Sequence, residues 1–72
     1  MITYSDKEKK DLVHKVELYR LDKGLSVKSL ADILQVNSGT IRHWEDGISL
    51  PNKVQCYQIS KLTNNFTPKV LK

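Results

Sequence analysis

Two short segments with periodic apolar residues, 26–34 and 37–46, are separated by only two residues, and this spacing constrains the fold more than any other feature. Their apolar residues are Leu30, Ala31, Ile33 and Leu34 in the first segment and Ile41 and Trp44 in the second. Recurrence at intervals of three and four residues indicates an amphipathic helix in each segment. Helices joined by so tight a turn are expected to cross at a steep angle, and the small side chain of Ala31 permits the close contact that this crossing needs.

The other helices are bounded by residues that favour helix ends. Ser5 and Glu8 have the spacing of a capping box, and Gly24 can adopt the left-handed conformation that ends a helix. Pro51 and Pro68 each suit the first turn of a further helix. The predicted helices span residues 5–23, 26–34, 37–46, 51–63 and 67–71. Because no alternating strand pattern appears, the sequence predicts an all-α fold of five helices.

Size and composition limit the classes of protein that the chain can represent. Its 72 residues leave room for one domain, residues 1–72, and 39% hydrophobic with 28% charged residues indicates a globular chain. No apolar run has the length of a membrane span, and the N-terminus lacks the apolar region of a signal peptide, so a cytoplasmic location is expected. The net charge of +4 is consistent with a polyanionic partner without requiring one.

The sequence contains no group of residues suited to catalysis or metal binding. Cys56 is the only cysteine, so it cannot form an intrachain disulfide, and it is expected to serve as a small buried apolar residue. The two histidines, His14 and His43, are isolated from each other and from any partner with metal-ligand spacing. We therefore expect no catalytic residue, no metal and no cofactor, and we expect that the chain is not an enzyme.

A tight turn followed by a helix with a polar outer face is the pattern of a helix-turn-helix. Residues 25–47, LSVKSLADILQVNSGTIRHWEDG, resemble the Cro/CI, or lambda-repressor-like, helix-turn-helix family. The resemblance covers residues 12–63, and its most specific part is the sequence WEDG at residues 44–47 followed by Pro51. It implies a compact five-helix lambda-repressor-like DNA-binding domain with its helix-turn-helix at about residues 26–46.

The resemblance also implies roles for individual residues. The exposed start of the third helix would enter the major groove of double-stranded DNA, where Arg42 could contact a guanine edge. The residues of this DNA- or partner-binding face are Asn37, Ser38, Gly39, Arg42 and His43. The candidates for phosphate contacts are Ser26 and Lys28 in the second helix and Asn52 and Lys53 in the fourth. Arg20 is implied to form a structural ion pair with Glu45.

Several positions depart from the family pattern. Val27 stands where the family usually has a glutamine that contacts the DNA backbone, and Gln35 replaces the usual turn glycine, so a left-handed conformation is expected there. Gly39 stands where a long polar side chain is common, and Asp46 adds a negative charge near the end of the third helix. The DNA-contacting face is therefore poorer in polar side chains than that of a strong operator-binding protein.

Two functions remain open at this point, and they do not exclude each other, because a repressor and an antirepressor can act jointly on DNA. The first is a phage-type transcriptional regulator that binds operator DNA. The chain also resembles, over its full length, the small modulator-of-repression antirepressors in the genetic switches of temperate phages of Gram-positive bacteria, which implies binding to a phage repressor's N-terminal domain. The host bacterial cytoplasm would be the location in both cases, and a homodimer is as compatible with the sequence as a monomer.

Apolar residues outside the expected core are the candidates for contact with a protein partner. These candidates are Ile48, Leu50, Phe66 and Leu71. For Phe66, Val70 and Leu71 the alternative is a C-terminal tail that folds back on the core.

Overall fold

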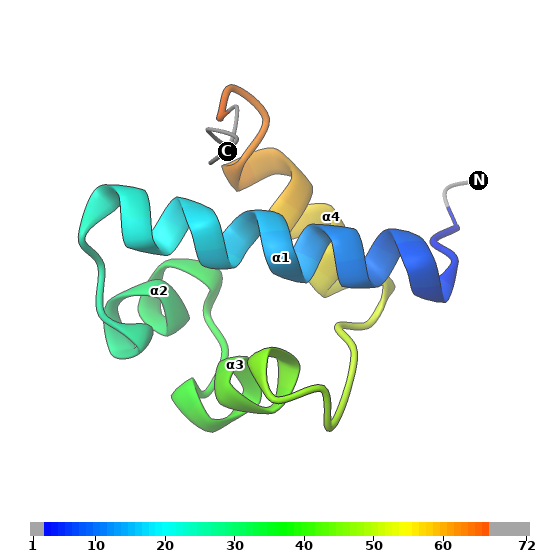
Figure 1. Ribbon diagram of the computed structural model, residues 1–72, viewed down its shortest axis with the longest axis horizontal. Coiled ribbons are helices and arrows are strands. Elements are labelled where there is room, and N and C mark those ends of the chain that lie inside the picture. The colour runs from blue at the N-terminus through cyan, green and yellow to red at the C-terminus, as the bar shows by residue number, and fades with distance from the viewer. Residues whose placement is uncertain (1–2, 67–72) are drawn as a thin grey trace, which may run out of the picture.

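The computed structural model describes residues 3–66, and these residues form four helices. The helices are α1 (Asp6–Lys23), α2 (Val27–Leu34), α3 (Ser38–Glu45) and α4 (Lys53–Leu62) (Figure 1). The described part of the chain contains no strand, which confirms the predicted all-α class there, and the predicted bounds of these helices are correct to within two residues. The predicted count of five helices is not matched, because the fifth, at residues 67–71, lies outside the described residues.

The long helix α1 runs across the molecule, with α4 behind it and the short pair α2 and α3 below it (Figure 1). The core is formed where these helices meet, and both α1 and α2 pack against α3 and α4. The buried core residues are Val13 and Val16 of α1, Leu30, Ala31 and Leu34 of α2, Ile41 and Trp44 of α3, and Ile59 of α4. The inward-facing residues predicted for α3 are therefore confirmed.

One residue of the apolar pattern in α2 does not join the core. Ile33 is 49% exposed, whereas Leu30, Ala31 and Leu34 are buried. The reason is geometric: Leu34 lies three and four residues after Ala31 and Leu30 and shares their side of the helix, but Ile33 points elsewhere. Ile33 therefore belongs to the apolar pattern of α2 without joining the buried core.

The ends of α1 and α2 follow the predicted capping chemistry. The Ser5 hydroxyl accepts a hydrogen bond from the backbone N–H of Glu8 at 3.2 Å, and the Glu8 carboxylate accepts one from the Ser5 N–H at 2.8 Å. Gly24 ends α1 at φ 69°, and Gln35 ends α2 in the same left-handed region at φ 59°. The predicted conformation of Gln35 is thus confirmed, and it is the only non-glycine residue of the described chain with positive φ.

The start of α4 differs from the prediction. Pro51 was expected in the first turn, but the helix begins at Lys53, and Asn52 is its N-cap. The Asn52 side chain accepts from the Gln55 N–H at 2.8 Å, and the Gln55 side chain accepts from the Asn52 N–H at 2.9 Å. This reciprocal pair satisfies two backbone donors, which a helix starting at the proline would not do. Pro51 instead lies buried before the cap, and its carbonyl accepts a hydrogen bond from the Cys56 thiol.

The chain after α4 turns back towards α1. Thr63 is fully buried, and its hydroxyl donates to the carbonyl of Ile59 at 2.8 Å. The Phe66 ring then packs edge-to-face on Tyr19, with 5.4 Å between the ring centroids. Phe66 therefore folds back on the helices, whereas Val70 and Leu71 lie outside the described residues.

Candidate nucleic-acid interface

The helix α3 is held by one side and exposed on the other. Ile41 and Trp44 are buried on the inner side. The five residues predicted to contact DNA are exposed, and we call them the α3 face: Asn37, Ser38, Gly39, Arg42 and His43. Because a helix advances 3.6 residues per turn, the four helical members of this set share the side opposite Ile41 and Trp44. The structure therefore brings together the residues that the sequence proposed for this face.

The first residue of the α3 face keeps its side chain free of the helix that it precedes. Asn37 occupies the N-cap position with extended backbone angles, as expected, but its side chain makes no capping hydrogen bond. By contrast, the N-cap side chains of the other three helices all accept a backbone N–H. The amide of Asn37 is therefore not committed to holding α3 together.

Two of the four candidates for phosphate contacts already serve the fold. The Ser26 hydroxyl accepts from the Ser29 N–H at 3.0 Å, and the Asn52 side-chain oxygen accepts from Gln55. Lys28 and Lys53 are exposed in the first turns of α2 and α4. These lysines are the two candidates that bring positive charge.

The charge at the helix starts separates α1 from the other three helices. The first turn of α1 carries Asp6 and Glu8, whereas the first turns of α2, α3 and α4 carry no acidic residue. The positive end of a helix dipole is neutralised by such acids and is left uncompensated without them. The three later helices therefore present N-termini that favour a negatively charged partner.

The position of α3 is tied to α1 by an ion pair at its C-terminal end. Arg20 Nε lies 3.4 Å from Glu45 Oε2, and the two side chains are 17% and 19% exposed. The guanidinium also donates from Nη1 to the carbonyl of Leu25 at 3.2 Å. Neither Arg20 Nε nor Glu45 Oε2 has a hydrogen-bond partner among the described residues, so each relies on the charge of the other. The residues implied to pair are thus in contact, away from the α3 face.

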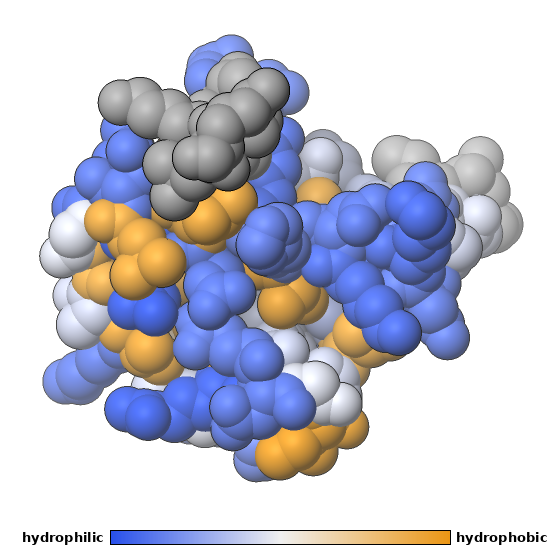
Figure 2. Space-filling view, in the orientation of Figure 1, coloured by the Kyte–Doolittle hydropathy of each residue, from blue (hydrophilic) through white to orange (hydrophobic). Residues whose placement is uncertain are grey.

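A groove of mixed apolar and charged residues lies beside the C-terminal end of α3. This groove of about 590 Å³ runs between α1 and the loop after α3. Its apolar lining residues are Val13, Trp44, Ile48 and Leu50, and its charged ones are Asp6, Lys10, Glu17 and Glu45. Ile48 is 69% exposed at this groove and Leu50 is half-buried. Figure 2 shows hydrophobic patches among mainly hydrophilic residues, one of them at the lower edge of the view, where Figure 1 shows this loop.

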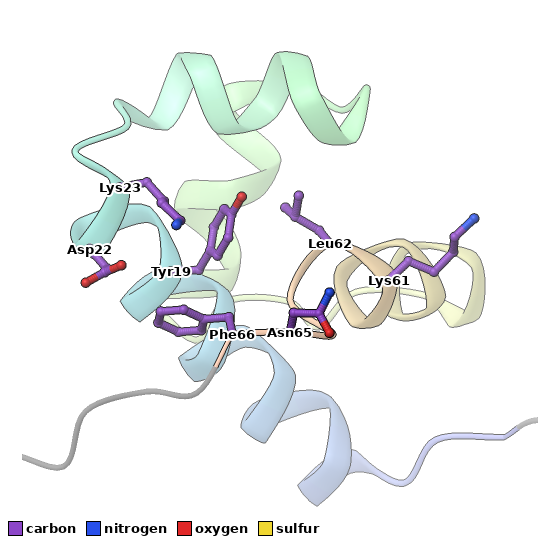
Figure 3. A pocket seen from close by; sticks show the side chains of 7 residues that line it. All are labelled: Tyr19, Asp22, Lys23, Lys61, Leu62, Asn65 and Phe66. Carbon is purple, nitrogen blue, oxygen red and sulfur yellow. The ribbon is translucent and has the colours of Figure 1, made fainter.

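The predicted protein-contact residues do not form one surface. Phe66 lines a separate open pocket of about 350 Å³ between the end of α1 and the end of α4 (Figure 3). Its walls include Tyr19, Lys23 and Lys61, and no residue of α3 lines it. Ile48 and Leu50 thus belong to a different hollow from Phe66, and Leu71 lies outside the described residues.

The sequence interpretation missed exposed apolar residues on α4. Val54 is 63% exposed and Tyr57 is 49% exposed. The Nζ of Lys61 lies 5.6 Å from the centre of the Tyr57 ring. Helical spacing could have indicated their exposure, because it places Val54, Tyr57 and Lys61 on a different side of α4 from Cys56 and Ile59.

Cys56 has the surroundings of a structural thiol. It is fully buried, and this burial raises the pKa of the thiol above its ordinary value of 9.0, while the nearby charge of Lys9 opposes that rise to a smaller extent. Nucleophilic cysteines need a lowered pKa. Among residues 3–66 we find no group of three or more histidine, cysteine, aspartate or glutamate residues that could hold a metal ion. No helix in the same part of the chain is long and apolar enough to cross a bilayer.

Comparison with known families gives one match. The model of a family described as helix-turn-helix matches residues 16–71, a segment that includes all of α2, α3 and α4. No curated protein and no solved structure matches the chain.

Proposed function

This chain belongs to the helix-turn-helix family, and on that premise we propose that it is a transcriptional regulator that binds duplex DNA through the α3 face. The observation that carries the proposal is the division of α3 into a buried side, anchored by Ile41 and Trp44, and an exposed polar side. A helix held in this way can enter the major groove without rearrangement of the core.

The exposed residues fall into two groups, one suited to base contacts and the other to phosphate contacts. Arg42 can donate two hydrogen bonds to the N7 and O6 atoms of a guanine, which is the commonest base-specific contact. His43 lies beside it and can donate to a base acceptor or to a phosphate. Lys28 and Lys53, at the starts of α2 and α4, would bind phosphates, which fixes the position of the domain without specifying sequence.

Fluorescence anisotropy with duplexes from the promoter region next to its own coding sequence tests this function. We expect specific binding that weakens as salt rises, because each neutralised phosphate releases counterions. Arg42→Ala should cost about 1–3 kcal/mol on the preferred duplex, whereas Lys28→Ala should weaken all duplexes alike and reduce the salt slope by about one.

Lys7→Ala is the matched control, since Lys7 is exposed on α1 and pairs with Asp11 at 3.3 Å. It removes the same charge from a helix outside the proposed interface. A loss of binding as large in Lys7→Ala as in Lys28→Ala would assign the effect to net charge instead of to a phosphate contact. Equal affinity of wild type for all duplexes would contradict sequence-specific regulation.

The second candidate function is that of an antirepressor in a phage genetic switch, binding the N-terminal domain of the phage repressor and blocking its DNA surface. The observation that favours it is the exposed apolar side chain of Ile48, whose backbone N–H donates to the carbonyl of His43 at the α3 face at 2.8 Å. The presence of Gly39 and Asp46 supports it further, because neither supplies a long donor to a base edge.

Adding the protein to a complex of the neighbouring repressor with its operator separates the two functions. An antirepressor should release the operator, and Ile48→Glu should abolish that release while leaving the fold intact, because the side chain is largely in solvent. A regulator that binds DNA by itself should leave the repressor on its own sites. The molar mass by analytical ultracentrifugation, alone and on the duplex, would decide between a monomer and a homodimer.

A further inference from the structure

The glycine on the α3 face is not required by the fold. Of the three glycines, Gly24 and Gly47 have positive φ, at 69° and 76°, whereas Gly39 lies in the first turn of α3 and does not. A β-carbon added at Gly39 would meet no neighbouring atom within 4 Å. Glycine is also the least favourable helix residue after proline. Alanine at this position should therefore fold at least as well.

Gly39 leaves a stretch of bare backbone on the exposed side of the helix. Arg42 and His43 lie three and four residues further on, and helical side chains lean towards the N-terminus, over the preceding turn. Both residues are exposed, as is Ser38 before the glycine. The bare backbone of Gly39 is thus open to solvent, since no side-chain atom lies within 4 Å of the place where its β-carbon would be. Arg42 and His43 begin on the next turn of the same exposed side.

Bare backbone at this position can select a partner only by shape, because Gly39 offers no side-chain donor or acceptor. Among the base edges of the major groove, thymine presents an apolar group, the C5 methyl, in addition to its carbonyl acceptor. Such a methyl can lie against the α-carbon of a glycine, whereas a β-carbon would compete for the same space. Arg42, on the next turn, would at the same time lie near a neighbouring base pair.

We propose that Gly39 is a specificity-determining residue that admits the C5 methyl of a thymine to the backbone of α3. This inference rests on the proposed DNA-binding function and deepens it. It assigns to the operator a thymine close to the guanine that Arg42 contacts. The α3 face then recognises a guanine through the hydrogen-bonding side chain of Arg42 and a thymine through the bare backbone of Gly39.

The experiment begins with a duplex that the wild-type protein selects from a random-sequence pool. Each thymine of this duplex is replaced in turn by uracil, which lacks only the methyl group. At one position uracil should weaken wild-type binding about fourfold, the effect of losing one buried methyl group. Gly39→Ala should weaken binding to the unmodified duplex about tenfold, as expected for loss of a base contact.

The combination of the two changes is the decisive measurement. Uracil at the sensitive position should restore part of the affinity that Gly39→Ala loses, because the added β-carbon can occupy the space left by the methyl group. The melting temperature of Gly39→Ala should be unchanged or higher by roughly 2–5 °C. A protein weakened only by misfolding would show neither this rescue nor this stability.

Asp32→Glu is the matched control, because it adds one methylene group to an exposed position of α2 without changing charge. It should leave affinity for both duplexes unchanged. Wild-type selection of a duplex whose binding is insensitive to Gly39→Ala and to every uracil would overturn the inference while leaving the proposed function standing. If wild type selects no duplex, the proposed function fails as well. Loss of a protein partner by Gly39→Ala, with duplex binding unchanged, would also overturn the assignment to thymine.

Discussion

The two sides of α3 have different surroundings, one packed in the core and the other exposed to solvent. On the inner side Ile41 and Trp44 are buried in the core, and Glu45 at the end of the helix contacts Arg20 of α1. On the outer side Arg42 and His43, their immediate neighbours in sequence, extend into solvent. The difference teaches that this fold can place a helix accurately while leaving the side available to a partner free of structural duties.

The same contrast appears at the starts of the helices. Ser5, Ser26 and Asn52 each cap the helix that follows with a side-chain hydrogen bond, whereas Asn37 does not. Capping residues contribute to stability because they satisfy backbone donors that the helix itself leaves unpaired. At α3 this contribution is absent, and the polar side chain stays exposed.

The largest expected loss of stability comes from a substitution on the inner side of α3. Ile41→Ala should destabilise the protein by about 2–5 kcal/mol, because it removes buried methyl groups and leaves a cavity. By contrast, Arg42→Ala at the next position should change the free energy of unfolding by no more than about 0.5 kcal/mol. Urea denaturation followed by the fluorescence of Trp44, the only tryptophan, measures both. If Ile41→Ala does not fold, Ile41→Val should still cost about 0.5–1.5 kcal/mol. Similar losses at the two positions would mean that α3 is not anchored by its inner side.

The next effect concerns the ion pair that ties α3 to α1. Arg20→Met should cost about 1–3 kcal/mol, because it leaves the mostly buried carboxylate of Glu45 without its positive partner. Arg42→Met, which removes the same charge from the exposed side, should cost about 0.5 kcal/mol or less. The double variant Arg20→Met with Glu45→Met should recover part of the loss, since no charge then remains unpaired. Equal melting temperatures of Arg20→Met and Arg42→Met would show that the ion pair does not stabilise the fold.

A smaller effect compares two asparagines at N-cap positions. Asn52→Ala should lower the free energy of unfolding by about 1 kcal/mol through loss of the cap of α4. Asn37→Ala should cost no more than about half as much, because no capping hydrogen bond is lost with its side chain. In DNA-binding assays the order should reverse, with Asn37→Ala the more harmful change. The opposite ranking in stability would show that Asn37 caps α3 in solution.

The smallest effect is a pH dependence from the buried thiol. Burial raises the pKa of Cys56 in the folded chain above the ordinary value of 9.0, so the thiol of the unfolded chain ionises first. The folded state then holds more protons than the unfolded state, and the contribution of Cys56 to stability is lost as pH rises above about 9. The difference in unfolding free energy between wild type and Cys56→Ala should therefore shrink between pH 8 and pH 10.5, roughly the range in which thiols titrate. A constant difference would indicate that the thiol is in contact with solvent.

Local features of the fold were predicted from the sequence because they depend on neighbours in the chain. The cap at Ser5 and the left-handed residues Gly24 and Gln35 all require only interactions within a few residues. The start of α4 is also local, yet Pro51 was wrongly preferred over Asn52. Both residues favour a helix start, and the reciprocal bonds with Gln55 decided between them.

Exposure was harder to predict, because it depends on which helices cover each other. Ile33, Val54 and Tyr57 are residue types common in protein cores, yet within residues 3–66 they remain 49%, 63% and 49% exposed. The residues of the α3 face were identified from the resemblance to the helix-turn-helix family, and the structure adds that they share one exposed side. The groove beside Ile48 could not be predicted, since it is formed by α1 and a loop distant from it in sequence.

The sequence by itself determined where these helices begin and end to within two residues and which side of α3 faces inward. Both follow from capping and from hydrophobic periodicity, which act over one or two turns of helix. Only the tertiary structure decided that Asn37 leaves its cap unmade and that Ile48 shares a groove with residues of α1. These features depend on how whole helices pack, because the positions of α1 and α3 determine which polar and apolar groups remain uncovered.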